Sequence, residues 1–198
     1  MNSIQPKSIK SLCVYCGSSL GNRPEILESA RVLGMELARR DITLIYGGGK
    51  VGIMGVIADA VLSSGGQVLG VITQFLDSKE VGHNDLTELH IVDSMHERKA
   101  LMAELADGFI ALPGGFGTLD ELFEILTWRQ LELHRKPCGL LNSEGYFDQL
   151  LAFLDRATSD KMLRPEHLSL LISDQDPDRL LDRMLTYLPS EFSKWDVQ

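Results

Sequence analysis

The sequence predicts a single α/β domain, built as a doubly wound parallel sheet with helices packed on both of its faces. Two observations carry this prediction. Short apolar runs alternate with longer segments in which the apolar residues have helical spacing. Glycine-rich turns follow three of the apolar runs, as expected where buried strands pass into helices. This alternation is typical of parallel strands joined by helical crossovers, a Rossmann-like arrangement.

The predicted elements follow one another along almost the whole chain. Apolar runs predict strands over residues 11–16, 43–46, 67–72, 89–92, 108–112, 138–141 and 170–172. Helical spacing predicts helices over residues 24–40, 53–64, 95–106, from 118 onward, 146–160 and 178–187. Residues 75–86 are polar and irregular, which indicates a surface excursion. We expect one nucleotide-binding catalytic domain over residues 11–188, a flexible N-terminus over 1–10 and a tail over 189–198.

Composition excludes several classes of function. The chain has 198 residues, with 44% hydrophobic and 24% charged residues, which is ordinary for a globular protein. A formal net charge of −9 without a basic stripe argues against a nucleic-acid or anionic-membrane partner. Three cysteines without a signal peptide indicate reduced thiols and a cytoplasmic protein. No apolar run approaches the roughly 20 residues that a membrane span needs.

A glycine turn at residues 113–117 is the strongest functional signal in the chain. The apolar strand over residues 109–112 is followed by Pro113, by three glycines within four residues, and by Thr118 at the predicted start of a helix. Glycines let backbone N–H groups approach a ligand closely, and the free amides of a first helical turn favour a phosphate. The turn therefore predicts an anion cradle at the carboxyl edge of the sheet.

Two further glycine turns follow strands and should lie at the same edge, over residues 17–21 and 47–55. In the second turn, Gly47, Gly49 and Gly52 match the spacing of a dinucleotide-binding fingerprint. No carboxylate ends the next strand, which disfavours a nicotinamide or flavin cofactor. A contact with a nucleotide or ribose phosphate, and a turn that merely packs tightly, both remain open. We predict no cofactor and no metal.

The segment from Thr118 to Glu121 has the spacing of a capping box, with Thr118 as N-cap and Glu121 at the third helical position. Capping alone would explain both residues, although the glycines before them exceed what a cap requires. Asp120 and Glu121 are adjacent, so their side chains point about 100° apart and only one should reach a ligand. Asp120, Glu124 and Thr127 should share one face of the helix.

Cations crowd the predicted start of another helix, at residues 95–99, which include Arg98 and Lys99. A charged first turn is often only a solvated face. Cations are nevertheless unfavourable at a helix N-terminus, so this pattern suggests that an anion is held nearby. By contrast, Cys13 and Cys16 lie three apart in a strand and point to opposite faces, which favours core packing over a disulfide or metal site.

Together these motifs resemble the Lonely Guy family of cytokinin riboside 5′-monophosphate phosphoribohydrolases, whose members were formerly labelled lysine decarboxylases. The resemblance covers residues 12–188 and rests on the glycines at 47–49, the Met-His-Glu-Arg-Lys run at 95–99 and the Pro-Gly-Gly-Phe-Gly-Thr turn at 113–118. It implies hydrolysis of the N-glycosidic bond of a nucleoside 5′-monophosphate, with AMP or prenylated adenine nucleotides as substrates, in a homodimer. A non-catalytic nucleotide-binding or carrier module is the alternative.

The resemblance also implies which residues act. It places the catalytic roles on Arg98 and Glu121. It places substrate contacts on Gly47, Gly48, Glu80, Met95, Lys99, Gly114, Gly115, Phe116, Gly117, Thr118 and Thr127. Phe116 stands where many relatives carry Tyr. From its predicted place at a helix N-terminus, Glu121 should stay ionised and act as a base or electrostatic stabiliser. Arg98 cannot give up its proton and should position phosphate or Glu121.

Overall fold

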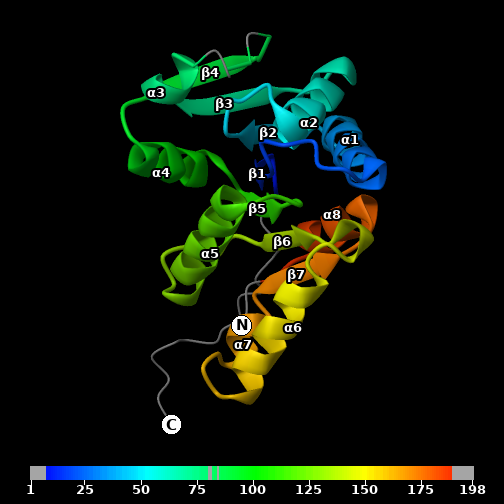
Figure 1. The fold of residues 1–198 in the computed structure, drawn as a ribbon, viewed down its shortest axis with the longest axis vertical. Coiled ribbons are helices and arrows are strands. Elements are labelled where there is room, and N and C mark those ends of the chain that lie inside the picture. Colours follow the sequence, from blue (N-terminus) through cyan, green and yellow to red (C-terminus); the bar gives the residue numbers. More distant parts are fainter. Residues whose placement is uncertain (1–7, 80–81, 84, 189–198) are drawn as a thin grey trace.

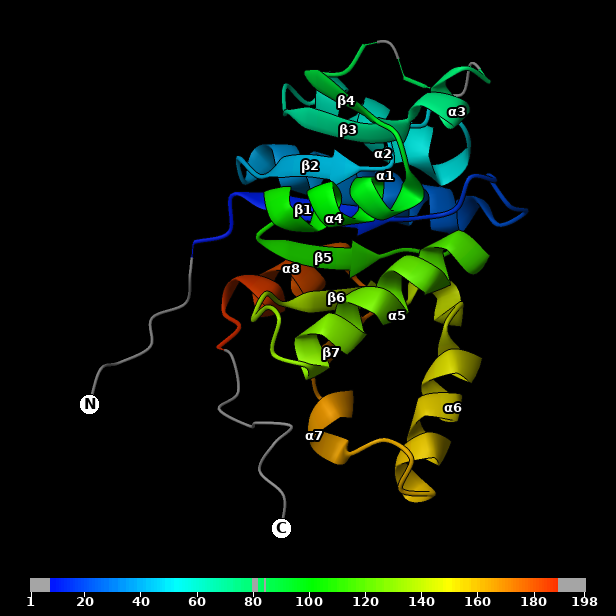
Figure 2. The same ribbon diagram turned by 90° about the vertical axis from the view of Figure 1, so that its left-hand side faces the viewer.

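The computed structural model describes residues 8–79, 82–83 and 85–188. Within them, seven parallel strands form one sheet in the order β4-β3-β2-β1-β5-β6-β7, so the doubly wound α/β fold is confirmed. The arrowheads of β2 and β5 point the same way in Figure 2. The strands are β1 (Ser11–Tyr15), β2 (Thr43–Tyr46), β3 (Val68–Thr73), β4 (Glu88–Val92), β5 (Gly108–Ala111), β6 (Cys138–Leu141) and β7 (Leu171–Asp174).

Helices cover both faces of this sheet (Figure 1). Helices α1 (Pro24–Arg39), α2 (Gly52–Ser63) and α8 (Pro177–Leu185) pack on one face, and α4 (Met95–Leu105) and α5 (Phe116–Gln130) on the other. The remaining helices are α3 (Gln74–Asp77), the 3₁₀ turn η1 (Ser143–Gly145), α6 (Asp148–Ser159) and α7 (Pro165–Leu168). None of the helices in the described residues is long and apolar enough to cross a membrane.

The two faces of the sheet have separate hydrophobic cores. Leu33 of α1, Ile57 of α2 and Leu180 of α8 belong to one buried cluster, whereas Met102 of α4 and Ile125 of α5 belong to the other. Apolar side chains project from both faces of the sheet, because parallel strands are buried on both sides. The sheet is therefore covered on both faces, and its carboxyl edge is the part left open for a ligand.

The predicted elements are found with shifts of one or two residues at most of their ends, and two short helices are additions. Residues 75–86 were expected to be irregular, but Thr73 caps the single turn α3, with its hydroxyl oxygen accepting a hydrogen bond from the Leu76 amide at 3.3 Å. Helix α7 is equally short. Four-residue helices have no periodicity from which they could be predicted. The expected flexible N-terminus and tail lie outside the described residues, except for residues 8–10.

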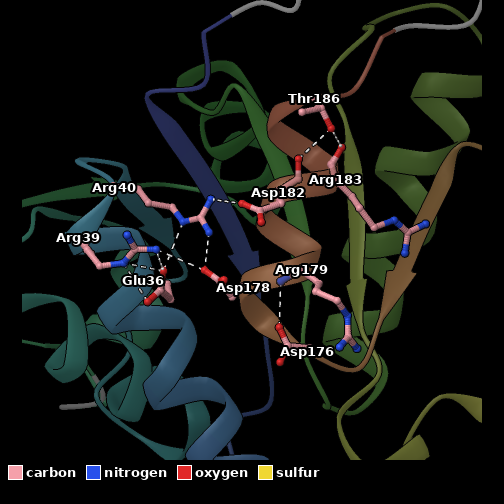
Figure 3. A network of polar contacts seen from close by, with 9 residues as sticks. All are labelled: Glu36, Arg39, Arg40, Asp176, Asp178, Arg179, Asp182, Arg183 and Thr186. Carbon is pink, nitrogen blue, oxygen red and sulfur yellow. Dashed lines mark hydrogen bonds and ion pairs between the residues drawn. The ribbon is translucent and has the colours of Figure 1, made fainter.

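Ion pairs join α1 to α8 on one face of the sheet (Figure 3). Arg40 is the centre of this network, with its Nη1 2.7 Å from Asp182 Oδ1 and its Nη2 paired with Asp178. Both aspartates are more than half exposed, so each pair contributes little alone. We assign the network a structural role in the packing of α8 against α1.

Candidate active site

The candidate site lies between β1 and β5, where the strand order reverses. The chain builds β2, β3 and β4 on one side of β1 and then returns to place β5 on the other side. The turns that follow β1 and β5 meet here, and the Gly17 amide donates a hydrogen bond to the Pro113 carbonyl at 3.1 Å. A Cβ atom at Gly17 would lie 3.2 Å from the Gly114 Cα, so the two turns cross closely here. Ligands of doubly wound folds bind at such a switch point.

Two adjoining cavities open at this edge. The smaller has a volume of about 210 Å³ and is lined by Arg98, Glu121 and Thr118. We call it the catalytic cavity because the resemblance places the catalytic roles on Arg98 and Glu121. A larger cavity of about 550 Å³ lies on the α1 side and shares Gly17, Ser18 and Gly115 with the first. Residues from all three predicted glycine turns line these cavities, which confirms that the turns lie at one edge of the sheet.

Arg98 and Glu121 form an ion pair inside the catalytic cavity, with 3.2 Å between Arg98 Nη1 and Glu121 Oε1. The Arg98 side chain is 9% exposed and that of Glu121 11%. Arg98 Nε donates to the Val71 carbonyl at 2.9 Å, which anchors the guanidinium to β3. A Cβ atom at Gly47 would lie 2.0 Å from Arg98 Nη2. Gly47 therefore leaves room for the Arg98 guanidinium, which any larger residue would displace.

Two other glycines of that turn are needed for the conformation of the backbone. Gly48 has a φ of +73° and Gly52 a φ of +62°, conformations that L side chains rarely adopt. A Cβ atom at Gly52 would lie 2.2 Å from the Ser18 carbonyl carbon. The interpretation of a tightly packed turn is therefore correct for Gly52, and the turn touches the catalytic cavity through Gly47.

The capping box predicted at Thr118 is wrong, because α5 begins at Phe116 with Gly115 as its N-cap. Thr118 is buried inside the first turn, and a Cβ atom at Gly114 would lie 2.1 Å from its Oγ1. Thr118 thus packs beneath the glycine loop that the sequence singled out. Counted from Phe116, Glu121 is the sixth residue of α5, so its carboxylate cannot accept from the free amides of the first turn.

This shift changes the electrostatics of Glu121. The prediction that a helix N-terminus keeps Glu121 ionised is wrong, because the dipole acts mainly within the first turn. Burial instead raises the pKa of the Glu121 carboxyl, and the Arg98 guanidinium opposes this by favouring the anion. The charged form of Glu121 therefore depends on a side chain from α4, not on the helix that carries it.

The cations at the start of α4 are held by protein carboxylates. Arg98 pairs with Glu121, whereas Lys99 Nζ lies 3.1 Å from both Asp120 Oδ2 and Glu124 Oε1. The anion that the sequence suggested near these cations is thus a set of carboxylates on α5. Asp120 is 62% exposed and Glu121 11%, which confirms that only one of the two adjacent carboxylates enters the cavity. Burial lowers the Lys99 pKa, but the hydrogen bonds to Asp120 and Glu124 outweigh this and raise it.

The remaining residues implied by the resemblance are distributed unevenly. Gly115, Phe116, Gly117 and Thr118 line the catalytic cavity, and Gly114 lines the larger one. Phe116 is 94% exposed and Met95 45% exposed, so both present apolar surface to solvent. Gly48 lies behind the cavity and accepts a hydrogen bond from the His83 amide at 2.9 Å. Glu80 lies outside the described residues.

Thr127 does not reach the cavities of its own chain. Its hydroxyl donates to the Phe123 carbonyl at 2.7 Å on the outer face of α5. It lines a shallow hollow on that face together with Asp120, Glu124 and Phe116, so the predicted shared face is confirmed.

Several lining residues were not predicted as site residues, chiefly Gly17 and Ser18 in the turn after β1 and Cys16 before it. The glycine-serine turn was a visible signal, since it follows a strand at the same edge. Cys16 packs with the cluster on the α1 side and Cys13 with the opposite one, as predicted. Burial raises the pKa of the Cys16 thiol well above its usual range, which makes it a poor nucleophile.

Comparison with known proteins identifies the family to which this arrangement belongs. Residues 54–184 match the model of a family described as "Possible lysine decarboxylase". The chain is 46% identical over 186 residues to the "Probable cytokinin riboside 5'-monophosphate phosphoribohydrolase LOGL9" of Oryza sativa subsp. japonica, covering 94% of this chain and 82% of that one. The chain belongs to the Lonely Guy family. A second member, the cytokinin riboside 5'-monophosphate phosphoribohydrolase LOG7 of Arabidopsis thaliana, is 47% identical over 180 residues, with 91% and 83% covered.

Solved structures confirm the fold of this Lonely Guy protein. A molybdenum cofactor binding protein from Rippkaea orientalis superposes with a TM-score of 0.66 at 20% identity, covering 91% of this chain and 96% of that chain. The Moco carrier protein of Chlamydomonas reinhardtii gives 0.67 at 18% identity, with 90% and 98% covered. At this level of identity the likeness extends to the fold alone.

Proposed function

We propose that this chain hydrolyses the N-glycosidic bond of nucleoside 5′-monophosphates, AMP and cytokinin riboside monophosphates, giving free base and ribose 5-phosphate. The observation that carries the proposal is the Arg98–Glu121 ion pair, buried in a cavity at the switch point of the sheet. The family relatives named above carry this activity in their names. The Glu121 carboxylate can act on the bond that breaks, and the glycine turns around it leave room for the nucleotide.

The chemistry follows from the charge that develops at C1′. Cleavage of the bond from C1′ to the base nitrogen builds oxocarbenium character, as in glycoside hydrolysis. The Glu121 carboxylate then stabilises this positive charge or accepts a proton from the attacking water. Arg98 is always protonated, so it keeps Glu121 ionised and holds the Glu121 carboxylate in position. Binding of the 5′-phosphate, remote from the bond that breaks, contributes to holding C1′ against the carboxylate.

A paired-substrate assay tests the proposal. The purified protein is incubated with AMP and, separately, with isopentenyladenosine 5′-monophosphate, and free base is measured by chromatography. We expect base release from at least one nucleotide, and release from neither contradicts the proposal. Stabilisation of the fold by AMP without any cleavage would instead support the alternative of a nucleotide carrier. Lys99 is a poor candidate for the Schiff-base residue of a decarboxylase, because its pKa is raised and two carboxylates hold its ammonium group.

We also propose that the protein works as a homodimer through the outer face of α5. Phe116, Leu119, Phe123 and Trp128 line the hollow there, and Phe116 is 94% exposed. Exposed apolar surface of this kind marks an interaction site. Thr127 lies in the same hollow, outside the cavities of its own chain, so a partner across this face would bring it toward a second site. The three unpaired cysteines support a reducing, cytoplasmic location.

Phe123→Glu tests the dimer. A charge in the middle of the α5 face should block association, because its carboxylate would be buried without a partner. We expect sedimentation velocity to give a dimer for the wild type and a monomer for Phe123→Glu. Phe153→Glu is the control on α6, since Phe153 is 63% exposed and does not line the hollow on α5, and this variant should remain dimeric. A wild-type monomer, or a Phe123→Glu dimer, contradicts the proposed interface.

A further inference from the structure

Tyr146 links the turn after β6 to the glycine turn after β5. Its hydroxyl donates a hydrogen bond to the Gly114 carbonyl at 2.8 Å, across 32 residues of chain. The bond spans two neighbouring strand ends, because β5 and β6 pair in the sheet. Tyr146 also lines the larger cavity, although the family resemblance gives it no role. The contact therefore ties a residue from outside the three glycine turns to the edge of the site.

The turn that carries Tyr146 is held in one shape. Asn142 is buried, its Oδ1 accepts a hydrogen bond from the Phe147 amide at 2.7 Å, and its Nδ2 donates to Asp148 Oδ1 at 2.7 Å. Glu144, between them, has a φ of +52°, a left-handed conformation that is uncommon for a residue other than glycine. Such conformations persist only where the surrounding structure enforces them, and they cluster at functional sites. The turn thus brings the Tyr146 hydroxyl to a fixed place beside the glycine turn.

The peptide between Gly114 and Gly115 needs such a hold. Neither residue has a Cβ atom, so the backbone here is freer to rotate than between other residues. This peptide is trans, so its carbonyl and its N–H point in opposite directions, and the bond to the Gly114 carbonyl turns the Gly115 N–H away from Tyr146. That N–H has no acceptor among the described residues, and Gly115 lines both cavities. Tyr146 thus decides which way a free donor at the site points.

Three successive carbonyls of the turn after β5 are each held by a different donor. The pairs are the Gly17 amide with Pro113, the Tyr146 hydroxyl with Gly114, and the Leu119 amide with Gly115. The first and the last are bonds between backbone groups. The middle bond comes from a side chain, so it can be removed while the backbone stays as it is. The effect of this contact can therefore be measured by itself.

We propose that Tyr146 is a positioning residue of the hydrolysis: its hydroxyl fixes the Gly114–Gly115 peptide, so that the Gly115 N–H is already oriented when the nucleotide binds. This inference rests on the proposed function and deepens it, because it adds a residue from the turn after β6 to the site. Tyr146 acts through Gly114 in this role and does not touch the atoms that react. Without the hydroxyl the peptide has to be ordered on binding, which weakens binding but leaves Glu121 and Arg98 in place.

Tyr146→Phe tests the role, because it removes the hydroxyl and keeps the ring. We expect KM to rise about three- to tenfold, the scale of one hydrogen bond, for the nucleotide that the wild type cleaves in the paired-substrate assay. The kcat should not change, because the ion pair between Arg98 and Glu121 is untouched.

Tyr187→Phe is the matched control. The Tyr187 hydroxyl accepts a hydrogen bond from Arg129 Nη2 at 3.1 Å, and Tyr187 is not among the described residues that line the two cavities. This variant loses the same group and one hydrogen bond, so a loss of stability alone should affect both variants alike. We expect the KM of Tyr187→Phe to equal that of the wild type.

Nuclear magnetic resonance measures the peptide itself, without substrate. Relaxation of the Gly115 amide nitrogen reports motion on the picosecond to nanosecond timescale, and exchange broadening reports slower rotation. We expect greater motion at Gly115 in Tyr146→Phe than in the wild type, and no such change in Tyr187→Phe.

An unchanged KM in Tyr146→Phe would overturn the positioning role, and so would unchanged motion at Gly115. An equal rise of KM in Tyr187→Phe would overturn it too, because the effect would then follow from lost stability. Failure of the proposed function has a different signature, since the wild type would then release base from neither nucleotide. The motion at Gly115 would in that case still decide whether the hydroxyl holds the peptide.

Discussion

Glu121→Gln is expected to lower kcat for AMP by about 10²- to 10⁴-fold, the usual contribution of a positioned acid or base. Gln keeps the size and the hydrogen-bonding oxygen of Glu but cannot accept a proton or stabilise the charge at C1′. KM should change little, because much of the binding energy is expected to come from the 5′-phosphate, which is remote from the bond that breaks. A discontinuous assay, in which free adenine is quantified in samples quenched at set times, gives kcat. Binding of AMP to the variant is measured by calorimetry.

Asp120→Asn is the matched control for this prediction. It removes a neighbouring carboxylate from the outer face of α5, where Asp120 is 62% exposed and holds Lys99. Its kcat should stay within a few-fold of the wild type. A full loss of activity in Asp120→Asn, or normal turnover in Glu121→Gln, would move the catalytic role away from Glu121.

The same control also tests the electrostatics of the site. Asp120 is one of the charges that raise the pKa of Glu121, although burial is the main cause. Activity needs ionised Glu121, so kcat/KM should fall as the pH drops through a pKa that lies above the ordinary value of a glutamate. In Asp120→Asn this acid limb should move to lower pH, because a like charge has been removed. An unchanged acid limb would show that another group controls it.

Much of the fold and part of the site could be predicted because their causes are local. Each buried parallel strand is a short apolar run, and each main helix has apolar spacing, so strands such as β2 and β6 and helix α1 are visible in the sequence. The three glycine turns could be placed at one edge because parallel strands share their carboxyl ends. The glycine-serine turn after β1 was among them, but nothing local showed that it lines both cavities.

The misplaced start of α5 and the partner of Arg98 had non-local causes. Thr118 and Glu121 have capping-box spacing, yet the helix begins two residues earlier, and Thr118 packs beneath Gly114 instead of capping. The unfavourable placement of cations at the N-terminus of α4 was visible in the sequence. The carboxylate that pairs with Arg98, however, lies 23 residues away, at Glu121. Local spacing cannot encode which of the adjacent carboxylates, Asp120 or Glu121, turns toward Arg98.

Replacing Arg98 by Met is expected to destabilise the fold by about 3–5 kcal/mol at neutral pH, the usual cost of leaving a buried charge without its partner. Arg98 is 7% exposed and bridges the Val71 carbonyl and Glu121, so Met fills part of its volume but pairs with neither. The free energy of unfolding is measured by urea titration. The double variant Arg98→Met/Glu121→Gln should recover most of the loss, because no buried carboxylate is then left unpaired.

The pH dependence of Arg98→Met separates this cause from a simple packing defect. Burial already raises the pKa of Glu121, and loss of the Arg98 guanidinium must raise it further. A carboxyl whose pKa is raised in the folded state is stabilising below its unfolded pKa, and that stability is lost as the pH rises through the folded pKa. The variant should therefore be more stable at pH 5 than at pH 7.5. A deficit that is equal at both pH values and persists in the double variant would mean that Arg98 serves packing alone, and that Glu121 does not depend on it for its charge.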